Sequence, residues 1–190
     1  MTTASLAPAG LTAGIWNIDT AHSEVSFVVR HLGLFKVRGS FAAFEGMLTV
    51  ASEVTESVVE VEVDMSSVDT RDPNRDNHLR SPEFFDAAQY PKMTFRSTAL
   101  RINAERACLV GDLTIRGVTR PLELEVEAVG ILTDPMGLTR VGFVAHGELL
   151  RSEFGMAFNM PLSDGGVMLS DKVRIELDIQ AVRQADLDVS

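Results

Sequence analysis

The chain has 190 residues, of which 45% are hydrophobic and 23% are charged, a composition typical of one globular domain with a sizeable core. Its formal net charge of −10 argues against partners that select for basic patches, namely nucleic acid and anionic membrane surfaces. The single cysteine excludes an intrachain disulfide, and its place in strand-like sequence favours a buried thiol at Cys108 over a reactive one.

The N-terminal segment has no basic stretch followed by an apolar run, so the sequence shows no secretory signal. No stretch reaches the ~18 apolar residues of a membrane span. We therefore expect a cytoplasmic protein without integral membrane association. Composition divides the chain into a mobile segment of small residues at 1–14, a single domain at 15–181 and a polar tail at 182–190.

The first part of the domain alternates apolar and polar residues, which is the period of half-buried β-strands. From Val59 to Asp64, for example, valines alternate with acidic residues. Gly39 and Gly46 interrupt two of the segments and predict bulges or barrel corners. Strands are expected at residues 15–18, 24–31, 37–41, 44–50 and 57–64.

The stretch from Ser67 to Pro91 breaks this pattern, with three prolines and many charges. Asp72 followed by proline predicts a first short helix, and Ser81 followed by proline predicts a second. The residue before each proline resists helical geometry, so we expect two separate helices within an insert at 72–88.

The alternating pattern then resumes, with strands expected at residues 92–102, 107–115, 122–129, 140–150 and 173–181. A hairpin connection is expected at 116–121, a turn at 134–137, and a long loop rich in Gly, Ser and Met at 151–171. The chain is thus mainly β, with about eight or more antiparallel strands, no internal repeat and one helical insert. Closure into a barrel would remove the exposed sheet edges, and a barrel of about eight strands can hold one elongated small ligand.

Four sequence blocks resemble the polyisoprenoid-binding, YceI-like family. Residues 16–33 follow its W-x-I-D-x-x-H-S-x-V-x-F-x-V-x-H-x-G opening, and residues 111–121 follow its G-D-L-T-I-x-G-V-T-x-P hairpin. Residues 67–91 resemble its central motif, and the segment from Gly142 to Gly155 resembles its late G-F and R-x-x-F-G pattern.

The resemblance implies a lipocalin-like, extended antiparallel barrel that holds a long hydrophobic chain, such as a polyprenyl group, a quinone tail or a fatty-acid derivative. Many members carry a signal peptide and are periplasmic. This sequence departs from them at its N-terminus, and on that departure we expect a cytoplasmic lipid carrier. Neither a cofactor nor a metal is required, and a homodimer is expected only on general frequency.

Inward-facing apolar residues are the candidates for lining such a tunnel, while the alternative is a barrel core filled by side chains. Alternation defines their common face but not their contact with a ligand. The candidate tunnel residues are Phe27, Val29, Phe41, Phe44, Val61, Leu113, Ile115, Phe143 and Met156.

Basic residues near the expected barrel mouth are candidates for binding a polar or phosphorylated head group, because arginine matches phosphate geometry. The alternative is structural pairing with Asp69, Asp76 and Asp86. The insert is expected to act as a lid whose apolar residues close the tunnel. The candidate head-group residues are Arg30, His31, Lys36, Arg38, His78, Arg80 and Arg151.

Asp76, His78 and Asp86, together with His22, are the candidates for a metal site or a general acid–base pair. Their spacing matches no H-x₃-H or H-E-x-x-H motif, and the sequence has no G-x-S-x-G elbow. We therefore expect these groups to satisfy helix ends and buried backbone, without catalysis. The expected function is binding of a lipid as a carrier, store or sensor. The alternatives are an enzyme acting on an isoprenoid lipid and a stress-related interaction protein without a transport role.

Overall fold

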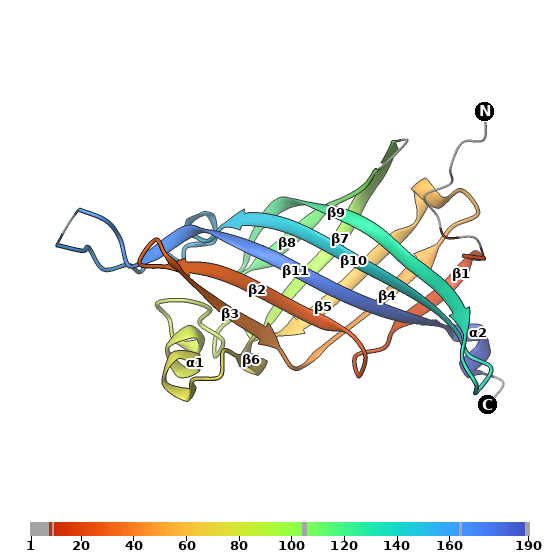
Figure 1. Cartoon of the computed structure of the whole chain (residues 1–190), viewed down its shortest axis with the longest axis horizontal. Coiled ribbons are helices and arrows are strands. Elements are labelled where there is room, and N and C mark those ends of the chain that lie inside the picture. Colours follow the sequence, from red (N-terminus) through yellow and green to blue (C-terminus); the bar gives the residue numbers. More distant parts are fainter. Residues whose placement is uncertain (1–7, 9, 104–105, 164, 189–190) are drawn as a thin grey trace.

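The structure is a computed structural model that describes residue 8 and residues 10–103, 106–163 and 165–188, and it is an elongated antiparallel β-barrel (Figure 1). Its strands are β1 (Gly14–Ile18), β2 (Glu24–His31), β3 (Phe35–Phe41), β4 (Phe44–Val50), β5 (Val58–Asp64), β6 (Val68–Asp69), β7 (Lys92–Asn103), β8 (Arg106–Ile115), β9 (Val118–Thr133), β10 (Thr139–Leu150) and β11 (Leu169–Arg183). The helices are α1 (Pro73–Arg80) and α2 (Gln184–Leu187), with 3-10 turns η1 (Val54–Glu56), η2 (Met65–Ser67) and η3 (Arg151–Phe154).

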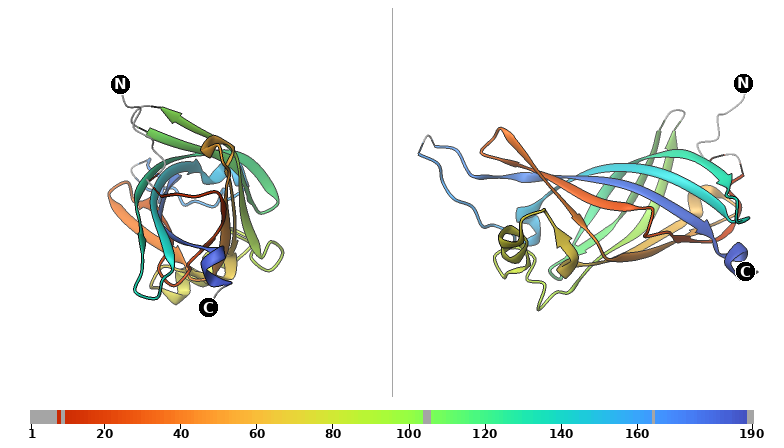
Figure 2. Two further views of the ribbon diagram at one scale, coloured as in Figure 1. Left: turned by 90° about the vertical axis from the view of Figure 1, so that its right-hand side faces the viewer. Right: turned by 60° about the horizontal axis from the view of Figure 1, so that its bottom comes forward.

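Eight strands close into a ring in the order β1-β4-β5-β7-β8-β9-β10-β11, because β11 pairs with β1 as well as with β10. The predicted closed barrel is thereby confirmed. On the edge that faces β1, β11 pairs with β1 only near its end, and its first part pairs with β2. The sheet then continues from β2 through β3 to the two-residue strand β6. Figure 2 shows the ring end-on and the β2–β3 ribbon running out at the α1 end.

The insert begins with the predicted first helix. The Asp72 carboxylate accepts hydrogen bonds from the backbone N–H groups of Asn74 and Arg75, at 3.0 and 3.2 Å, and caps α1. The predicted second helix is wrong: residues 81–90 form turns. The backbone N–H groups of Phe85 and Ala87 bond back to the last carbonyls of α1, which ties this segment to the helix end instead.

Two glycines that predicted bulges lie in regular ladders. Gly39 pairs with Phe27 without a register shift, and Gly46 pairs with Val61 in the same way. A Cβ at Gly39 would lie 2.4 Å from the Phe27 ring, so close approach of that ring is the reason for glycine there. Register shifts occur elsewhere, one of them between Gly142 and Phe143.

The end of the barrel away from α1 is tightly packed. Trp16 is fully buried, and Val141 and Ala181 are 1% and 0% exposed. The strands run slightly past the predicted domain bounds, since β1 begins at Gly14 and β11 continues to Arg183 before α2. Of the segment predicted to be mobile, residues 1–7 and 9 lie outside the described residues, as do 189 and 190 of the tail.

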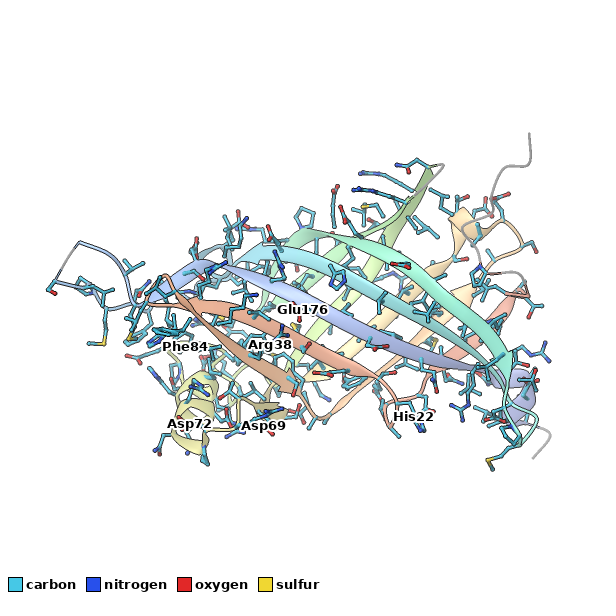
Figure 3. The ribbon with its side chains drawn as sticks, in the orientation of Figure 1. His22, Arg38, Asp69, Asp72, Phe84 and Glu176 are labelled. Atoms are coloured by element: carbon cyan, nitrogen blue, oxygen red, sulfur yellow. The ribbon has the colours of Figure 1, made fainter. Side chains whose placement is uncertain are left out.

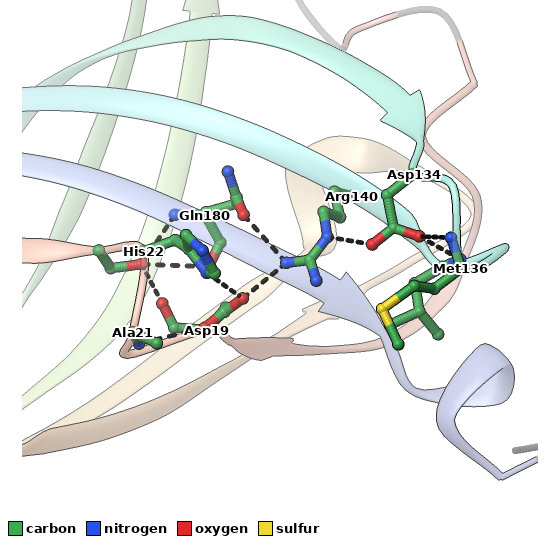
Figure 4. Close-up of polar contacts among 9 residues, drawn as sticks. Asp19, Ala21, His22, Asp134, Met136, Arg140 and Gln180 are labelled. Atoms are coloured by element: carbon green, nitrogen blue, oxygen red, sulfur yellow. Dashed lines mark hydrogen bonds and ion pairs between the residues drawn. The ribbon is translucent and has the colours of Figure 1, made fainter.

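Arg140 links three segments of the chain at this packed end through hydrogen bonds (Figure 4). Its guanidinium donates to Asp19 at 2.6 Å, to Gln180 at 3.0 Å and to Asp134 at 2.7 Å, and its side chain is only 18% exposed. Burial raises the pKa of Asp19, but hydrogen bonds from Arg140 and His22 outweigh that effect and leave the pKa below its ordinary value. The hydrogen bond from Arg140 likewise lowers the pKa of Asp134. The network thus keeps both carboxylates charged.

Candidate functional site: an apolar tunnel in the barrel

The barrel interior is hollow. A cavity of about 450 Å³ lies inside it and is lined by side chains from all eight strands of the ring, in the size range of small-molecule binding sites. This excludes the filled-core alternative. On β11 the lining runs from Leu169 to Ile179, which at ~3.3 Å per residue and a strand tilt near ~40° corresponds to about 25 Å along the barrel axis. The cavity is therefore a tunnel rather than a round pocket.

Almost all the predicted tunnel residues reach this cavity. The exception is Phe44, the first residue of β4, whose half-buried ring packs against the core cluster and does not line the cavity. It lies on the correct face, but it begins the strand immediately after the turn from β3. The residues that do line the cavity are Phe27, Val29, Phe41, Val61, Leu113, Ile115, Phe143 and Met156.

The basic groups of the lining are gathered at the α1 end. The basic side chains there are His31, Arg75, His78 and Arg151, whereas no carboxylate of the described residues lines the cavity. The opposite end is lined by apolar residues such as Leu11 and Val50. The tunnel therefore has one basic end and one apolar end.

Four predicted head-group residues do not line the cavity: Arg30, Lys36, Arg38 and Arg80. The first three occupy even positions of β2 and β3, whose odd positions face inward, and the Arg38 guanidinium pairs with Glu176 (Figure 3). Arg80 donates to the carbonyls of Ser66 at 2.7 Å and Val68 at 2.9 Å, so it holds η2 and β6 against α1. Arg38 and Arg80 therefore have structural partners, but these are Glu176 and backbone carbonyls rather than the predicted Asp69, Asp76 and Asp86.

Arg151 is the most buried of the basic lining residues, at 5% exposure. Its guanidinium donates to the carbonyl oxygens of Ser170 at 3.0 Å, Met156 at 2.5 Å and Phe158 at 2.8 Å. Burial lowers its pKa from the ordinary value, partly offset by the charge of Asp171, yet arginine remains a cation in proteins. Its positive charge is thus held by carbonyl dipoles beside the tunnel, with no carboxylate in direct contact among the described residues.

Arg75 reaches the cavity although it was not among the predicted site residues. It lies three residues before His78 and four before Leu79, on the face of α1 that lines the cavity, so helical spacing would have identified it. Its Nε donates to the Thr70 hydroxyl at 2.7 Å. The buried Asp76 carboxylate accepts from the backbone N–H and hydroxyl of the same Thr70, at 2.8 and 2.6 Å, which is a structural role.

His78 lies between two aromatic rings at the mouth of the tunnel. Its ring centroid is 4.9 Å from that of Phe84 and 4.9 Å from that of Phe158, in edge-on geometry. Its Nε2 contacts the carboxylate of Glu83. Phe84 belongs to the insert and Phe158 to the loop before β11, so the three rings join the insert to the barrel at its basic end.

The candidate residues for metal binding or acid–base chemistry do not form one site. His22 pairs with Asp19 at 2.9 Å, at a turn far along the chain and the barrel from α1. Within the part of the chain that the structure describes, no three His, Cys, Asp or Glu side chains form a metal-binding group. Cys108 is half-buried and does not line the cavity, and burial, followed by the charge of Glu123, raises the pKa of its thiol.

A closed antiparallel barrel around an apolar cavity defines the lipocalin-like class of proteins. Within that class, residues 16–181 match the YceI-like domain, and the chain belongs to this family. The family suggested by the four sequence blocks is therefore confirmed.

The relatives agree with this assignment. The chain is 37% identical over 163 residues to a UPF0312 protein of Staphylococcus epidermidis, covering 85% of this chain and 93% of that protein. A crystal structure of a Campylobacter jejuni YceI protein is 30% identical with a TM-score of 0.68, covering 87% and 95% of the two chains. A polyisoprenoid-binding domain from Saccharophagus degradans, 13% identical with a TM-score of 0.65 over 88% and 98% of the chains, shares the fold. No helix among the described residues has the length and apolar character needed to cross a membrane.

Proposed function

We propose that this protein binds one long-chain amphiphilic lipid in the tunnel, as a carrier, store or sensor. The chemical class is a polyisoprenoid, a quinone-type lipid or a fatty-acid derivative. The observation that carries the proposal is the continuous apolar cavity with basic groups at one end only. The polyisoprenoid binding named for the Saccharophagus degradans domain, which shares the fold, supports the same class of ligand.

The dimensions of the tunnel favour a single extended chain. A volume of about 450 Å³ that extends over about 25 Å describes a long, narrow cavity rather than a compact one. This shape matches one extended chain, whose carbon atoms contact the lining side chains at ~3.5–4.0 Å.

The energetics favour a long chain over a short one. Each buried methylene contributes about 0.8 kcal/mol. Association costs roughly 4–15 kcal/mol in lost freedom, so only a chain that places on the order of ten or more methylenes inside is bound tightly.

The basic end gives the ligand a direction. Arg151, His78 and Arg75 line the α1 end, and no described carboxylate lines the cavity there, although Glu83 contacts His78 and Asp72 lies 3.9 Å from Arg75 outside the lining. A polar or anionic head group placed at this end meets cationic and imidazole donors, and its apolar tail extends toward Leu11 and Val50. The reverse orientation would bury the head group among aliphatic side chains without hydrogen-bond partners, which is unfavourable.

The test is native mass spectrometry of the purified protein, together with an organic extract of the same sample. We expect a long-chain species in stoichiometric amount. Phe143→Trp enlarges a side chain that lines the tunnel and should lower the occupancy several-fold, whereas Val144→Trp, its neighbour on β10 outside the lining, should not. A protein that remains empty after purification and after incubation with such lipids would contradict the proposal.

A further inference from the structure

Two hairpins project beyond α1 at the basic end of the tunnel (Figures 1 and 2). Both carry exposed apolar side chains. The β2–β3 turn exposes Leu34 and Phe35, at 76% and 61%, and the loop before β11 exposes Met160 and Val167, at 53% each. The two hairpins are joined, since the Leu32 N–H donates to the Met168 carbonyl at 2.8 Å. We call Leu32, Leu34, Phe35, Met160 and Val167 the hairpin tip.

The hairpin tip continues the apolar lining of the tunnel. Phe35 lies two residues before Val37 on the same face of β3, and Val37 lines the cavity. Phe35 is paired with His31, another lining residue. On the second hairpin, Met168 lines the cavity and Val167 precedes it. An apolar surface therefore runs from inside the barrel out to the tip.

Two cations flank this surface. Arg30 and Lys36 are exposed and lie directly opposite each other in the β2–β3 ladder, a placement of like charges that disfavours the pairing. Neither forms an ion pair with a carboxylate among the described residues. Residues 29–38 contain no acidic residue, although the whole chain carries a formal net charge of −10. In the adjoining loop, the one acidic residue between 154 and 170, Asp164, lies outside the described residues.

We propose that the hairpin tip docks on the surface of an anionic lipid bilayer. The apolar side chains enter the interfacial region, and Arg30 and Lys36 contact lipid phosphates, which is the pattern of a peripheral membrane contact. Docking places the basic mouth of the tunnel against the bilayer, so that a lipid passes between them without crossing water. The transfer of lipid rests on the function proposed above, whereas docking rests on the tip alone.

The net charge of the protein does not oppose this contact. At an ionic strength of ~0.1 M, exposed charges farther apart than about 10 Å are largely screened, so the bilayer responds to the local charge. The local charge at the tip is positive, and the general argument from the net charge against anionic membrane surfaces does not extend to it. The exposed apolar residues at the opposite end, such as Leu132 and Met136, lie beside Asp134.

Co-sedimentation with vesicles tests the proposal. With vesicles of phosphatidylcholine and phosphatidylglycerol in equal amounts, each basic residue near the surface strengthens binding about fivefold, so Arg30→Gln with Lys36→Gln should weaken it about 25-fold. Leu34→Ser with Phe35→Ser should weaken binding at least tenfold. The matched control, Leu132→Ser with Met136→Ser, removes side chains of 60% and 83% exposure at the other end and should leave binding unchanged.

Three results would overturn docking: wild-type protein that does not sediment with these vesicles, tip variants that bind like the wild type, or a control that weakens binding equally. Light scattering that shows a dimer dissociated by the tip substitutions, without vesicle binding, would assign the tip to contact with a second copy. Far-ultraviolet circular dichroism verifies that each variant is folded. The tip residues lie outside the tunnel lining, so extraction of lipid from the same variants separates the docking proposal from the lipid-binding proposal. Tip variants that contain lipid but fail to dock would support both proposals. Protein that docks but contains no lipid would contradict only lipid binding.

Discussion

Substitution of Ala145 by phenylalanine should shorten the tunnel without closing it. Ala145 is 6% exposed, lies in the middle of β10 and lines the cavity between its paired neighbours Val126 and Leu177, which also line it. The added ring projects into the narrow cavity from a strand that lines it and blocks the passage at this level. A lipid entering from the α1 end would then stop at this level.

The depth that remains follows from strand geometry. From Arg151 at the basic end to Ala145 there are six residues, which at ~3.3 Å each and a tilt near ~40° give about 15 Å of depth. An extended chain advances about 1.25 Å per carbon, from the C–C bond length and bond angle. Measured from the same Arg151 level, the wild-type lining of β10 extends eight residues to Phe143, or about 20 Å, and accepts about 16 carbons, whereas the Ala145→Phe tunnel accepts about 12.

Dissociation constants for saturated fatty acids of increasing length, measured by displacement of a fluorescent fatty acid from stripped protein, test this estimate. Burial of about 0.8 kcal/mol per methylene corresponds to about a fourfold gain in affinity per carbon as an upper limit. Wild-type affinity should rise up to about 16 carbons. In Ala145→Phe the rise should end near 12, so the variant should match the wild type for dodecanoate and lose up to about 250-fold for a 16-carbon acid.

His146→Phe is the control, because it adds the same ring at the next residue, which is exposed and does not line the cavity. Its chain-length profile should equal that of the wild type. The tunnel geometry would be refuted if Ala145→Phe and wild type showed the same profile, or if Ala145→Phe weakened short and long acids equally.

Three further predictions concern stability. Arg151→Leu removes three hydrogen bonds to carbonyl oxygens at a buried site and should lower the free energy of unfolding by about 3 kcal/mol in urea titrations; an unchanged midpoint would mean that water replaces the guanidinium. Gly39→Ala forces the Phe27 ring away from a contact of 2.4 Å and should cost about 1–3 kcal/mol in the same assay, whereas strain-free accommodation would show no loss. The hydrogen bond from Arg183 lowers the pKa of Asp186 from 3.8 to about 2, so its stabilising effect is complete above pH ~4 and is lost as the pH falls toward 2; Asp186→Asn should flatten the acid side of the melting-temperature profile in that window, and a parallel profile would contradict the assignment.

Much of the barrel could be predicted from the sequence because alternation has a direct physical cause. Successive side chains of a strand point to opposite faces, so Phe27 and Val29 had to share one face, and that face had to be buried. The same rule placed Arg30 and Arg38 on the outer face, and applying it to the basic residues would have excluded them from the tunnel. Periodicity thus predicted the lining better than residue chemistry predicted the head-group site.

Other features depend on contacts that no local pattern records. Arg80 is fixed by carbonyls of Ser66 and Val68, which reach it only after η2 and β6 have folded beside α1. The second helix likewise does not form, because the N–H groups of Phe85 and Ala87 donate hydrogen bonds to the last carbonyls of α1. Whether the interior is hollow depends on the total volume of the inward side chains relative to the circumference of the ring. A hollow barrel and a filled barrel show the same alternation, so the sequence pattern does not distinguish them.

The two ends of the barrel differ in how easily they can admit a ligand. At the Trp16 end, the ring is closed by the β1–β11 and β1–β4 ladders and by the Arg140 network, so entry there requires breaking core packing and charged hydrogen bonds together. At the α1 end, the insert is attached to the barrel sheet through β6, which pairs with β3 at only two positions, Ser40 with Asp69 and Phe41 with Val68. A displacement of α1 and the Phe84 segment would separate the aromatic rings around His78 while leaving the eight-stranded ring intact. Because opening at this end breaks fewer backbone hydrogen bonds, the proposed lipid would enter at the end that holds the basic groups, tail first, with its head group at Arg151.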